Sequence, residues 1–382
     1  MYIDDYKRWL SADLEDPALT DELRKIEGQD NEIKERFAVA LKFGTAGLRG
    51  ILGAGSNRMN IYVVRQATQG LANWVKTQGG SQLVAISYDS RINSDVFARN
   101  AACVLADNAL MPVPALSFAT RYYKANAGIM ITASHNPAKY NGYKAYGPDG
   151  CQMTDDAAAV VYAEIQKTDI LTGAEMMAFE DGIAQGLIEY VGEDCKEALY
   201  SAIEACAVRP GICKTAGLKL VYSPLNGSGL VPVTRVLHDI GIDDITIVPE
   251  QQYPDGNFPT CPYPNPEIRE AMALGIAYAG RCGADLLLAT DPDCDRVGGA
   301  VRDPSGGYAL LSGNETGMLL LDYLCAQRTK HGRMPADPVM IKTIVTTDMA
   351  GRIAAHYGVK TINVLTGFKF IGEQIGRLEA QG

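Results

Sequence analysis

Hydrophobic and polar positions along the chain follow one arrangement that recurs three times. A short apolar strand leads into a loop of small polar residues, then a helical run, a Gly or Asn stop and a second apolar strand. The copies are "QLVAISYDSRINSDVFARNAACVLADNALMPVPAL", "LKLVYSPLNGSGLVPVTRVLHDIGIDDITIV" and "PVMIKTIVTTDMAGRIAAHYGVKTINVL". Strands that alternate with helices form parallel or mixed sheets covered by helices. The pattern therefore predicts an α/β protein with three successive α/β/α domains.

Local signals within these copies predict where individual elements begin and end. In the first copy, residues 83–88 are predicted as a strand, residues 93–94 as an N-cap and residues 95–108 as a helix. In the third copy, residues 346–348 are predicted to cap a helix that ends at Gly358. Each copy should thus place a polar loop at the end of a buried strand.

Composition shifts suggest the domain boundaries. A charged helical stretch at 186–208 and a glycine-rich stretch at 303–317 separate the three copies. We expect domains at 1–205, 206–310 and 311–382, each with a three-layer α/β/α arrangement and a mixed sheet. The third copy is followed by no further strand, so we expect the third domain to be partial.

The bulk composition restricts the class of partner. The chain has 382 residues, of which 47% are hydrophobic, with no secretory signal region and no apolar run of about 18 residues. Nine cysteines lack any CxxC pair, which favours reduced thiols and a cytoplasmic location. A formal charge of −10 disfavours nucleic acid and anionic membranes as partners. An anionic substrate must therefore be held by a few placed cationic side chains.

The segment "ADLLLATDPDCDR", residues 284–296, is the strongest candidate for a metal site. Asp291, Asp293 and Asp295 follow an apolar strand at alternate positions, so in an extended loop their carboxylates face the same side. Such carboxylates repel one another unless a cation lies among them, and oxygen ligands at this density suit Mg²⁺. The spacing predicts a magnesium site.

Three other structures or functions could account for this segment. A calcium EF-hand is excluded, because its glycine and glutamate positions are occupied by Arg296 and Arg302. A phosphatase that forms an aspartyl phosphate also begins with a strand and Asp-x-Asp, and stays open as a rival. The third alternative is a turn in which aspartates only satisfy backbone groups.

Ser134 lies in "ITASHNPAKYNGYK", residues 131–144, between an apolar strand and a polar loop. Ser, His, Asn and Pro are all turn residues, and serine is a good N-cap, so a structural role is open. Ser134 lacks the Gly-x-Ser-x-Gly pattern of a hydrolase elbow. Lys144, ten residues further along the chain, could place its ammonium group beside this loop. A serine, a Mg²⁺ site and a lysine together indicate phosphoryl transfer. His135 is the only one of the four histidines that lies in such a motif.

Two further segments offer weaker signals. "FGTAGLRG", residues 43–50, provides glycines whose backbone N–H groups can approach an anion, together with Arg49. "TGFK", residues 366–369, places Lys369 just after a turn. For both segments, a plain turn with a solvated cation is the alternative.

One further segment partly matches the dinucleotide-binding pattern. "LKLVYSPLNGSGLVP" has a strand followed by Gly227 and Gly229, and Glu250 lies at the end of the next strand. Pro232 occupies the place of the third small residue of that fingerprint, so the match is a two-glycine match of a kind that often arises by chance.

"TASHNPAKYNGYK", "DPDCDR", "FGTAGLRG" and "TGFK" together resemble motifs of the α-D-phosphohexomutases. The closest resemblance is to the phosphoglucomutase branch that also contains phosphopentomutases and members labelled phosphomannomutase. The resemblance implies four domains around a central cleft, each lending one loop. It covers the chain from its N-terminal helix to its last residues.

The resemblance implies a role for each site residue. Ser134 matches the phosphoserine that donates and re-accepts the phosphoryl group. The implied metal ligands are Asp291, Asp293, Asp295 and a phosphate oxygen on Ser134. Arg296 would lie beside that phosphate, and the residues that would assist the chemistry are Arg49, Lys144 and His135. The implied contacts to the sugar phosphate are Thr366, Gly367 and Lys369, besides Arg49 and Arg296.

The implied reaction is a two-step exchange. Phosphoserine phosphorylates the free hydroxyl of a sugar monophosphate, the bisphosphate turns over, and the serine takes back the other phosphate. The resemblance implies Mg²⁺ as cofactor, glucose 1,6-bisphosphate as activator, glucose 1-phosphate and glucose 6-phosphate as substrates, and no obligate protein partner. Phosphopentomutase, phosphomannomutase and glucose-1,6-bisphosphate synthase activities are alternatives. A non-catalytic phosphosugar-binding module with an unmodified Ser134 is an alternative of another class.

Two departures from the family pattern affect these expectations. The family usually has "TPLHGTG" in the second domain, whereas this chain has "SPLNGSG", with Asn226 in the place of the histidine. The chain also ends before the family's sugar-binding loop of the third domain and its fourth domain. We therefore expect a truncated chain that keeps the serine and metal sites and has little turnover.

Overall fold

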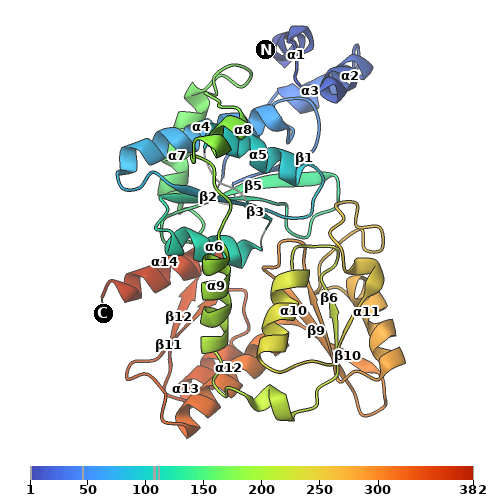
Figure 1. Cartoon of the computed structure of the whole chain (residues 1–382), viewed down its shortest axis with the longest axis vertical. Helices are drawn as coiled ribbons and strands as arrows, with labels where there is room; N and C mark the ends of the chain where they lie inside the picture. Colours follow the sequence, from blue (N-terminus) through green and yellow to red (C-terminus); the bar gives the residue numbers. More distant parts are fainter. Residues whose placement is uncertain (1, 45–46, 106–108, 111, 382) are drawn as a thin grey trace. The chain divides into compact units, whose positions relative to one another are not determined.

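The computed structural model describes residues 2–44, 47–105, 109–110 and 112–381. The chain divides into two compact units, Met1–Val191 and Gly192–Gly382, which are described separately below (Figure 1). Among the described residues, no helix combines the length and the apolar character needed to cross a membrane.

The first unit contains eight helices and five strands among its described residues. The helices are α1 (Tyr2–Ser11), α2 (Pro17–Lys25), α3 (Asp30–Phe37), α4 (Ile61–Gln78), α5 (Ser94–Val104), α6 (Val113–Tyr122), α7 (Asp155–Lys167) and α8 (Phe179–Ala184). The strands are β1 (Leu48–Ile51), β2 (Val84–Tyr88), β3 (Ala109–Leu110), β4 (Ala127–Ile131) and β5 (Tyr140–Tyr146).

The strands of this unit form one mixed sheet in the order β1-β5-β4-β2-β3. β2 pairs with β3 and β4 in parallel, whereas β5 pairs with β4 and β1 antiparallel. Successive strand residues point to opposite faces, so Ile129 and Ile131 join the larger core while Met130 joins a smaller core that includes Leu116 of α6. The larger core also contains residues of α4, α5 and α7, which gives the three layers α/β/α (Figure 1).

The described part of the second unit has the remaining elements. The helices are α9 (Glu193–Ala205), α10 (Leu230–Asp239), α11 (Arg269–Cys282), α12 (Gly313–Lys330), α13 (Met349–His356) and α14 (Phe368–Glu379), with short 3-10 turns η1 (Ile212–Thr215) and η2 (Pro249–Gln251). The strands are β6 (Leu220–Ser223), β7 (Ile245–Ile247), β8 (Leu286–Thr290), β9 (Val297–Arg302), β10 (Tyr308–Leu311), β11 (Val339–Thr343) and β12 (Lys360–Val364).

A second mixed sheet has the order β10-β9-β8-β6-β7. Alternation again divides its side chains, because Val221 and Leu287 face the core under α11, whereas Tyr222 and Leu288 face the core that includes Leu237 of α10. β11 and β12 form a separate parallel pair. Their core contains Cys325 of α12 and Ala354 of α13.

The predicted fold class is confirmed: the two five-stranded sheets are mixed and helices cover their faces. The strand predicted at 83–88 is β2. Asn93 is the N-cap of α5, but it has a left-handed backbone and makes no side-chain capping bond. The predicted helix 95–108 is shorter in the structure, because α5 ends at Val104 and its C-cap Leu105 has an extended backbone; residues 106–108 lie outside the described residues.

The helix of the third copy is also present. Thr347 supplies its cap through a hydroxyl that accepts the Met349 N–H at 3.3 Å, while Asp348 makes no side-chain capping bond. Gly358 follows the helix with φ 72°, a conformation that glycine adopts at no steric cost. The boundaries 1–205, 206–310 and 311–382 stay a proposal.

Candidate active site

Ser134 lies in the turn that joins β4 to β5. Its φ of 51° is in the left-handed region, which costs a non-glycine residue of the order of 1–3 kcal/mol. The Ser134 N–H donates to the hydroxyl of Thr132 at 2.7 Å, so Thr132 is a side chain that organises the turn. The N-cap alternative for Ser134 is wrong, because the next element is a strand and not a helix.

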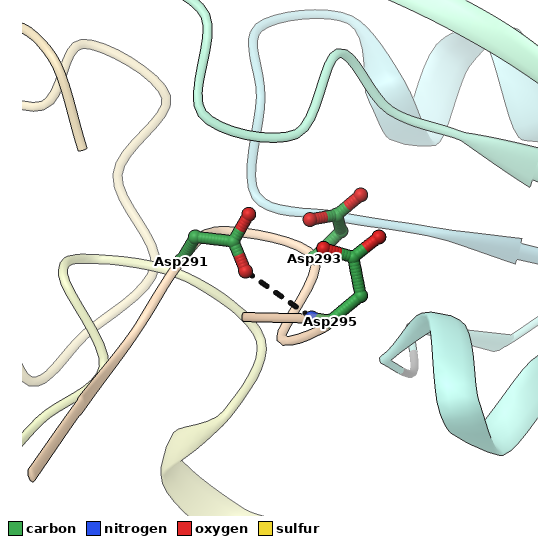
Figure 2. A group of neighbouring side chains, drawn as sticks. All are labelled: Asp291, Asp293 and Asp295. Atoms are coloured by element: carbon green, nitrogen blue, oxygen red, sulfur yellow. Dashed lines mark hydrogen bonds between the residues drawn. The ribbon is translucent and has the colours of Figure 1, made fainter. Parts of the chain in front are cut away.

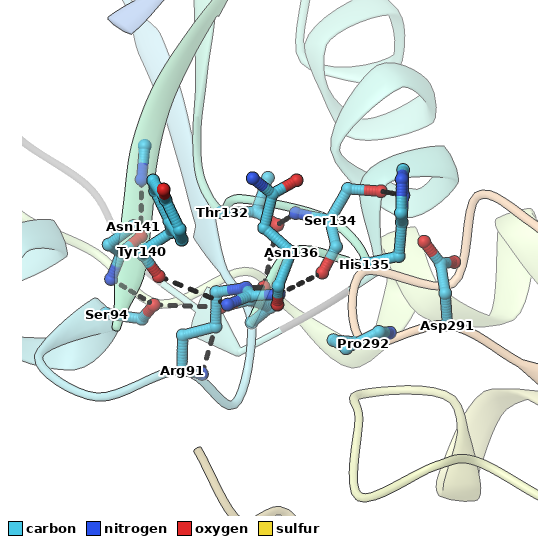
Figure 3. A network of polar contacts seen from close by, with 12 residues as sticks. Arg91, Ser94, Thr132, Ser134, His135, Asn136, Tyr140, Asn141, Asp291 and Pro292 are labelled. Carbon is cyan, nitrogen blue, oxygen red and sulfur yellow. Dashed lines mark hydrogen bonds and ion pairs between the residues drawn. The ribbon is translucent and has the colours of Figure 1, made fainter. Parts of the chain in front are cut away.

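Polar groups of the same unit surround this turn, hereafter the serine loop (residues 132–140; Figure 3). The Ser134 hydroxyl lies 3.1 Å from Nδ1 of His135. Arg49, exposed on β1, donates to the side-chain carbonyl of Asn136 at 3.2 Å. The structure thus brings Arg49 to the loop through Asn136. Lys144 is buried on β5, with its Cα paired to Met130 of β4.

Gly47 of "FGTAGLRG" allows the chain to pack closely against β5. The N–H groups of Gly44 and Gly47 each donate to the other's carbonyl. A Cβ on Gly47 would lie 1.9 Å from the Tyr143 carbonyl oxygen, and its φ is 75°. Only glycine fits there. Thr45 and Ala46, which complete the motif, lie outside the described residues.

The sequence interpretation missed an arginine beneath the serine loop. Arg91 follows β2, its side chain is fully buried, and it donates to backbone carbonyls of the loop. Its Nε lies 3.4 Å from a carboxylate oxygen of Asp89, which is equally buried. A signal was available, since a buried Asp-Ser-Arg directly after an apolar strand needs partners for both charges.

In the second unit, the three aspartates converge as predicted, although their loop is a turn and not extended. Oxygens of Asp291, Asp293 and Asp295 all lie within 4.8 Å of one another (Figure 2). The turn is closed by the Cys294 N–H on the Asp291 carbonyl at 2.9 Å, with Cys294 at φ 56°. Asp291 and Asp293 are buried, and Asp295 is exposed.

The donor set of this turn, hereafter the aspartate loop (residues 291–296), fits a hard divalent cation. Each residue can offer a carboxylate oxygen, which is the ligand type that Mg²⁺ prefers. Two buried carboxylates placed this close repel each other, and a bound cation removes that cost. Burial raises the pKa of the Cys294 thiol to about 12, and sulfur is a soft ligand that a hard cation such as Mg²⁺ does not prefer.

Backbone groups and one pairing fix the end of this loop. One Asp291 carboxylate oxygen accepts the N–H groups of Asp295 at 3.1 Å and Arg296 at 3.0 Å. The guanidinium of Arg296 lies 3.4 Å from a carboxylate oxygen of Glu267. The Arg296 N–H bond to Asp291 holds the backbone of this arginine beside the aspartates, and its side chain pairs with Glu267.

The "SPLNGSG" loop supports the aspartate loop. Both the N–H and the hydroxyl of Ser228 donate to the Pro292 carbonyl at 2.9 Å. A Cβ on Gly227 would lie 2.5 Å from the Pro292 Cα, so glycine is required by this contact. Asn226 donates its amide to the carbonyls of Glu250 and Tyr253 at 3.2 and 2.9 Å. These residues therefore organise the chain around the aspartates, which is a different task from approaching a dinucleotide.

Replacing Gly227 with alanine should displace Pro292 and weaken metal binding at the aspartate loop. The Cβ would also lie 2.9 Å from the Pro224 carbonyl oxygen, so backbone on two sides would have to move. Misplaced supporting groups typically cost roughly 10- to 100-fold in metal affinity. Titration calorimetry with Mn²⁺ measures the change.

Gly280→Ala is the matched control for this substitution. Gly280 is exposed in α11 and a Cβ there meets nothing within 4 Å. Alanine in such a helical position should stabilise the protein by up to about 1 kcal/mol and leave Mn²⁺ affinity unchanged. Equal Mn²⁺ affinity in the Gly227 variant and the wild type would refute the supporting role of the contact.

The third candidate loop follows β12 in the same unit. Thr366 and Gly367 lead into α14, and Gly367 has φ 130°, which favours glycine. Lys369 is buried in the first turn of α14, with its Nζ 4.6 Å from the centre of the Phe370 ring. The structure thus places Lys369 at a helix start after a parallel strand, where α/β folds often bind ligands.

Family models match most of the chain in three consecutive segments. The models for phosphoglucomutase/phosphomannomutase alpha/beta/alpha domains I, II and III match residues 40–171, 201–306 and 312–381. The chain belongs to the phosphoglucomutase/phosphomannomutase family of α-D-phosphohexomutases. Family membership replaces the phosphatase and dinucleotide-binding interpretations of the two loops.

Individual relatives agree with this assignment. The chain is 34% identical over 354 residues to a phosphoglucomutase of Staphylococcus saprophyticus and 36% identical over 355 residues to one of Staphylococcus haemolyticus. Each match covers 91% of this chain and 63% of the relative. The chain thus spans less than two thirds of the length of these curated relatives.

Solved structures show the same fold. A protein of Thermus thermophilus named as a phosphomannomutase matches with a TM-score of 0.71 at 24% identity, covering 89% of this chain and 72% of that one. A phosphoglucomutase/phosphomannomutase family protein of Burkholderia thailandensis matches with a TM-score of 0.69 at 21% identity, covering 88% and 68%. At these identities the likeness supports the fold alone.

Proposed function

We propose that this chain carries the phosphoserine and the metal site of a Mg²⁺-dependent phosphosugar mutase. The observation that supports it most is the convergence of three carboxylates within 4.8 Å in the aspartate loop, in a member of this family. Ser134 is the proposed phosphoryl carrier, with Asp291, Asp293 and Asp295 as metal ligands. That a phosphate on Ser134 also binds the metal is a proposal from the family resemblance.

In the proposed reaction, Ser134 carries the phosphoryl group and basic side chains move the protons. In the forward step, the bond between Ser134 Oγ and phosphorus breaks while a bond forms to the free hydroxyl of a sugar monophosphate. The departing Oγ takes up a proton, for which protonated His135 would be the donor. The sugar hydroxyl loses its proton to a base, for which Lys144 and Lys369 are the candidates. On the return step, Ser134 Oγ attacks the other phosphate and gives its proton to a base, for which we propose His135, whose Nδ1 lies 3.1 Å away. The departing sugar oxygen would take a proton back from the lysine.

Cationic groups complete the proposed centre. Bound Mg²⁺ would supply charge stabilisation on the phosphate oxygens. Arg49 and Arg296 would bind phosphate oxygens through their guanidinium groups. Thr366, Gly367 and Lys369 would contact the sugar phosphate.

The substrate pair that we propose is glucose 1-phosphate and glucose 6-phosphate, with glucose 1,6-bisphosphate as intermediate and activator. The names of the curated relatives support the glucose assignment. Phosphomannomutase, phosphopentomutase and glucose-1,6-bisphosphate synthase remain alternatives on the same scaffold, and a cytoplasmic location remains an expectation from the sequence.

The proposal is tested by the mass of one peptide. Trypsin should release residues 125–139, which contain Thr132, Ser134 and His135. After incubation of the chain with glucose 1,6-bisphosphate and Mg²⁺, we expect one acid-stable phosphate, placed on Ser134 by fragmentation. An acid-labile phosphate would indicate His135. No phosphate under any condition would contradict the carrier role and favour a binding module.

A further inference from the structure

One buried arginine holds the backbone of the serine loop. Nη1 of Arg91 donates to the carbonyls of Pro137 and Tyr140, each at 3.1 Å. Nη2 donates to the carbonyls of Ser134 and Asn136. A single guanidinium therefore binds four carbonyls within seven residues of chain (Figure 3).

This arrangement matches the geometry of guanidinium. Its two terminal nitrogens carry four N–H groups in one plane, and each pair can reach two acceptors at once. Buried loop carbonyls need donors, because an unpaired polar group away from water is costly. A lysine ammonium has three donors on one atom and cannot match the fork.

Asp89 contacts Arg91 directly and contacts the N–H of Ser134 through the hydroxyl of Thr132. One oxygen of Asp89 lies 3.4 Å from Arg91 Nε and accepts the hydroxyl of Thr132 at 2.7 Å. The same Thr132 oxygen accepts the Ser134 N–H at 2.7 Å. The second oxygen of Asp89 accepts the Arg91 N–H at 3.0 Å and the Ser94 hydroxyl at 2.8 Å.

The N–H and the C=O of Ser134 are thus fixed by one connected network. A left-handed conformation of a non-glycine residue persists only where its surroundings impose it. With φ held at 51°, the direction of the Ser134 Cα–Cβ bond relative to the loop is set, and the hydroxyl that it carries lies beside His135.

We propose that Arg91, oriented by Asp89, is a positioning residue for phosphoryl transfer at Ser134. It imposes the left-handed serine conformation from which the hydroxyl accepts and donates the phosphoryl group. This inference rests on the proposed function of Ser134. Arg91 acts through the loop backbone and forms no bond to the phosphate in this role.

The test compares Arg91→Met and Arg91→Ala with the wild type in the full chain. The rate constant for phosphate incorporation at Ser134 is measured with saturating glucose 1,6-bisphosphate and Mg²⁺, and the donor concentration for half-maximal rate is measured separately. We expect the rate constant to fall about 100-fold, because small misplacements of a reacting group have effects of this size. The half-saturating concentration should change little.

Two further variants separate positioning from general stability. Arg65→Met removes another buried arginine of the same unit, which pairs with Glu15 at 2.6 Å and does not touch the serine loop. It should lower the melting temperature without a comparable loss of rate constant. Arg91→Lys should stay as slow as Arg91→Met, since an ammonium cannot replace the fork. Added guanidinium, well below unfolding concentrations, should restore part of the rate of Arg91→Ala.

The outcomes distinguish the positioning role of Arg91 from the proposed function of Ser134. An Arg91→Met chain that is phosphorylated at the wild-type rate would overturn the inference and leave the proposed function standing. Equal rate losses in the Arg65 and Arg91 variants, without guanidinium rescue, would also overturn it. If Arg91→Met does not fold, Asp89→Asn is used in its place. We expect this variant to lose less of the phosphorylation rate constant than Arg91→Met would. A rate constant equal to that of the wild type would overturn the inference. A wild-type chain that never accepts phosphate would overturn the proposed function and this inference together.

Discussion

Replacing Ser134 with alanine should abolish the transfer of phosphate from glucose 1,6-bisphosphate to the chain. Alanine lacks the hydroxyl that forms the bond to phosphorus in the proposed exchange. Phosphate incorporation into the 125–139 peptide, measured by mass, should fall to background at every Mg²⁺ concentration. Mn²⁺ binding at the aspartate loop should be retained, because the aspartates themselves are unchanged.

The left-handed backbone at Ser134 calls for a second variant. Alanine is disfavoured at φ 51°, so loss of activity in Ser134→Ala could arise from a change of loop conformation. Ser134→Gly removes the same hydroxyl and accepts this backbone at no steric cost. Both variants should be inactive, and Ser201→Ala, at an exposed serine of α9, should behave like the wild type. Phosphate on the peptide of either Ser134 variant would show that another residue is the carrier.

Replacing Asp293 with asparagine should remove metal binding and, with it, phosphorylation of Ser134. Asparagine keeps the volume of the side chain but exchanges a charged ligand for a neutral amide within a set of three. The loss should exceed the roughly 10- to 100-fold typical of supporting residues, because a direct ligand is altered. Calorimetry with Mn²⁺ and the 125–139 peptide assay measure the two effects.

Thermal unfolding gives an independent measure of the same site. A ligand present at 100 times its Kd stabilises the folded state by about 2.7 kcal/mol, so Mg²⁺ should raise the melting temperature of the wild type. This increase should be absent in Asp293→Asn. Asp285→Asn is the matched control, since Asp285 is exposed just before β8 whereas the aspartate loop follows that strand. A wild-type response to Mg²⁺ in Asp293→Asn would rule out Asp293 as a ligand.

The sequence by itself determined the fold class and the identity of the candidate chemical groups. The apolar runs of β4 and β8 and the helical runs between strands are local patterns, and a strand that is apolar at nearly every position is expected to be buried on both faces of a sheet. The Asp-x-Asp-x-Asp spacing likewise brings three carboxylates together within one short loop, whatever turn the backbone adopts. Patterns of this kind involve only a few neighbouring residues, so they can be recognised in the sequence without knowing which distant segments are in contact.

Tertiary structure alone decided how the reactive loops are held. Arg91 meets the Ser134 carbonyl across 43 positions of chain, and Ser228 meets the Pro292 carbonyl across 64. Neither contact produces a periodic pattern in the sequence, because a hydrogen bond between distant segments depends on the order and register of strands. The left-handed conformation of Ser134 could not be predicted from the sequence for the same reason. Serine has no intrinsic preference for φ 51°. The hydrogen-bond network of Arg91, Asp89 and Thr132 that accompanies this conformation exists only once the sheet has formed.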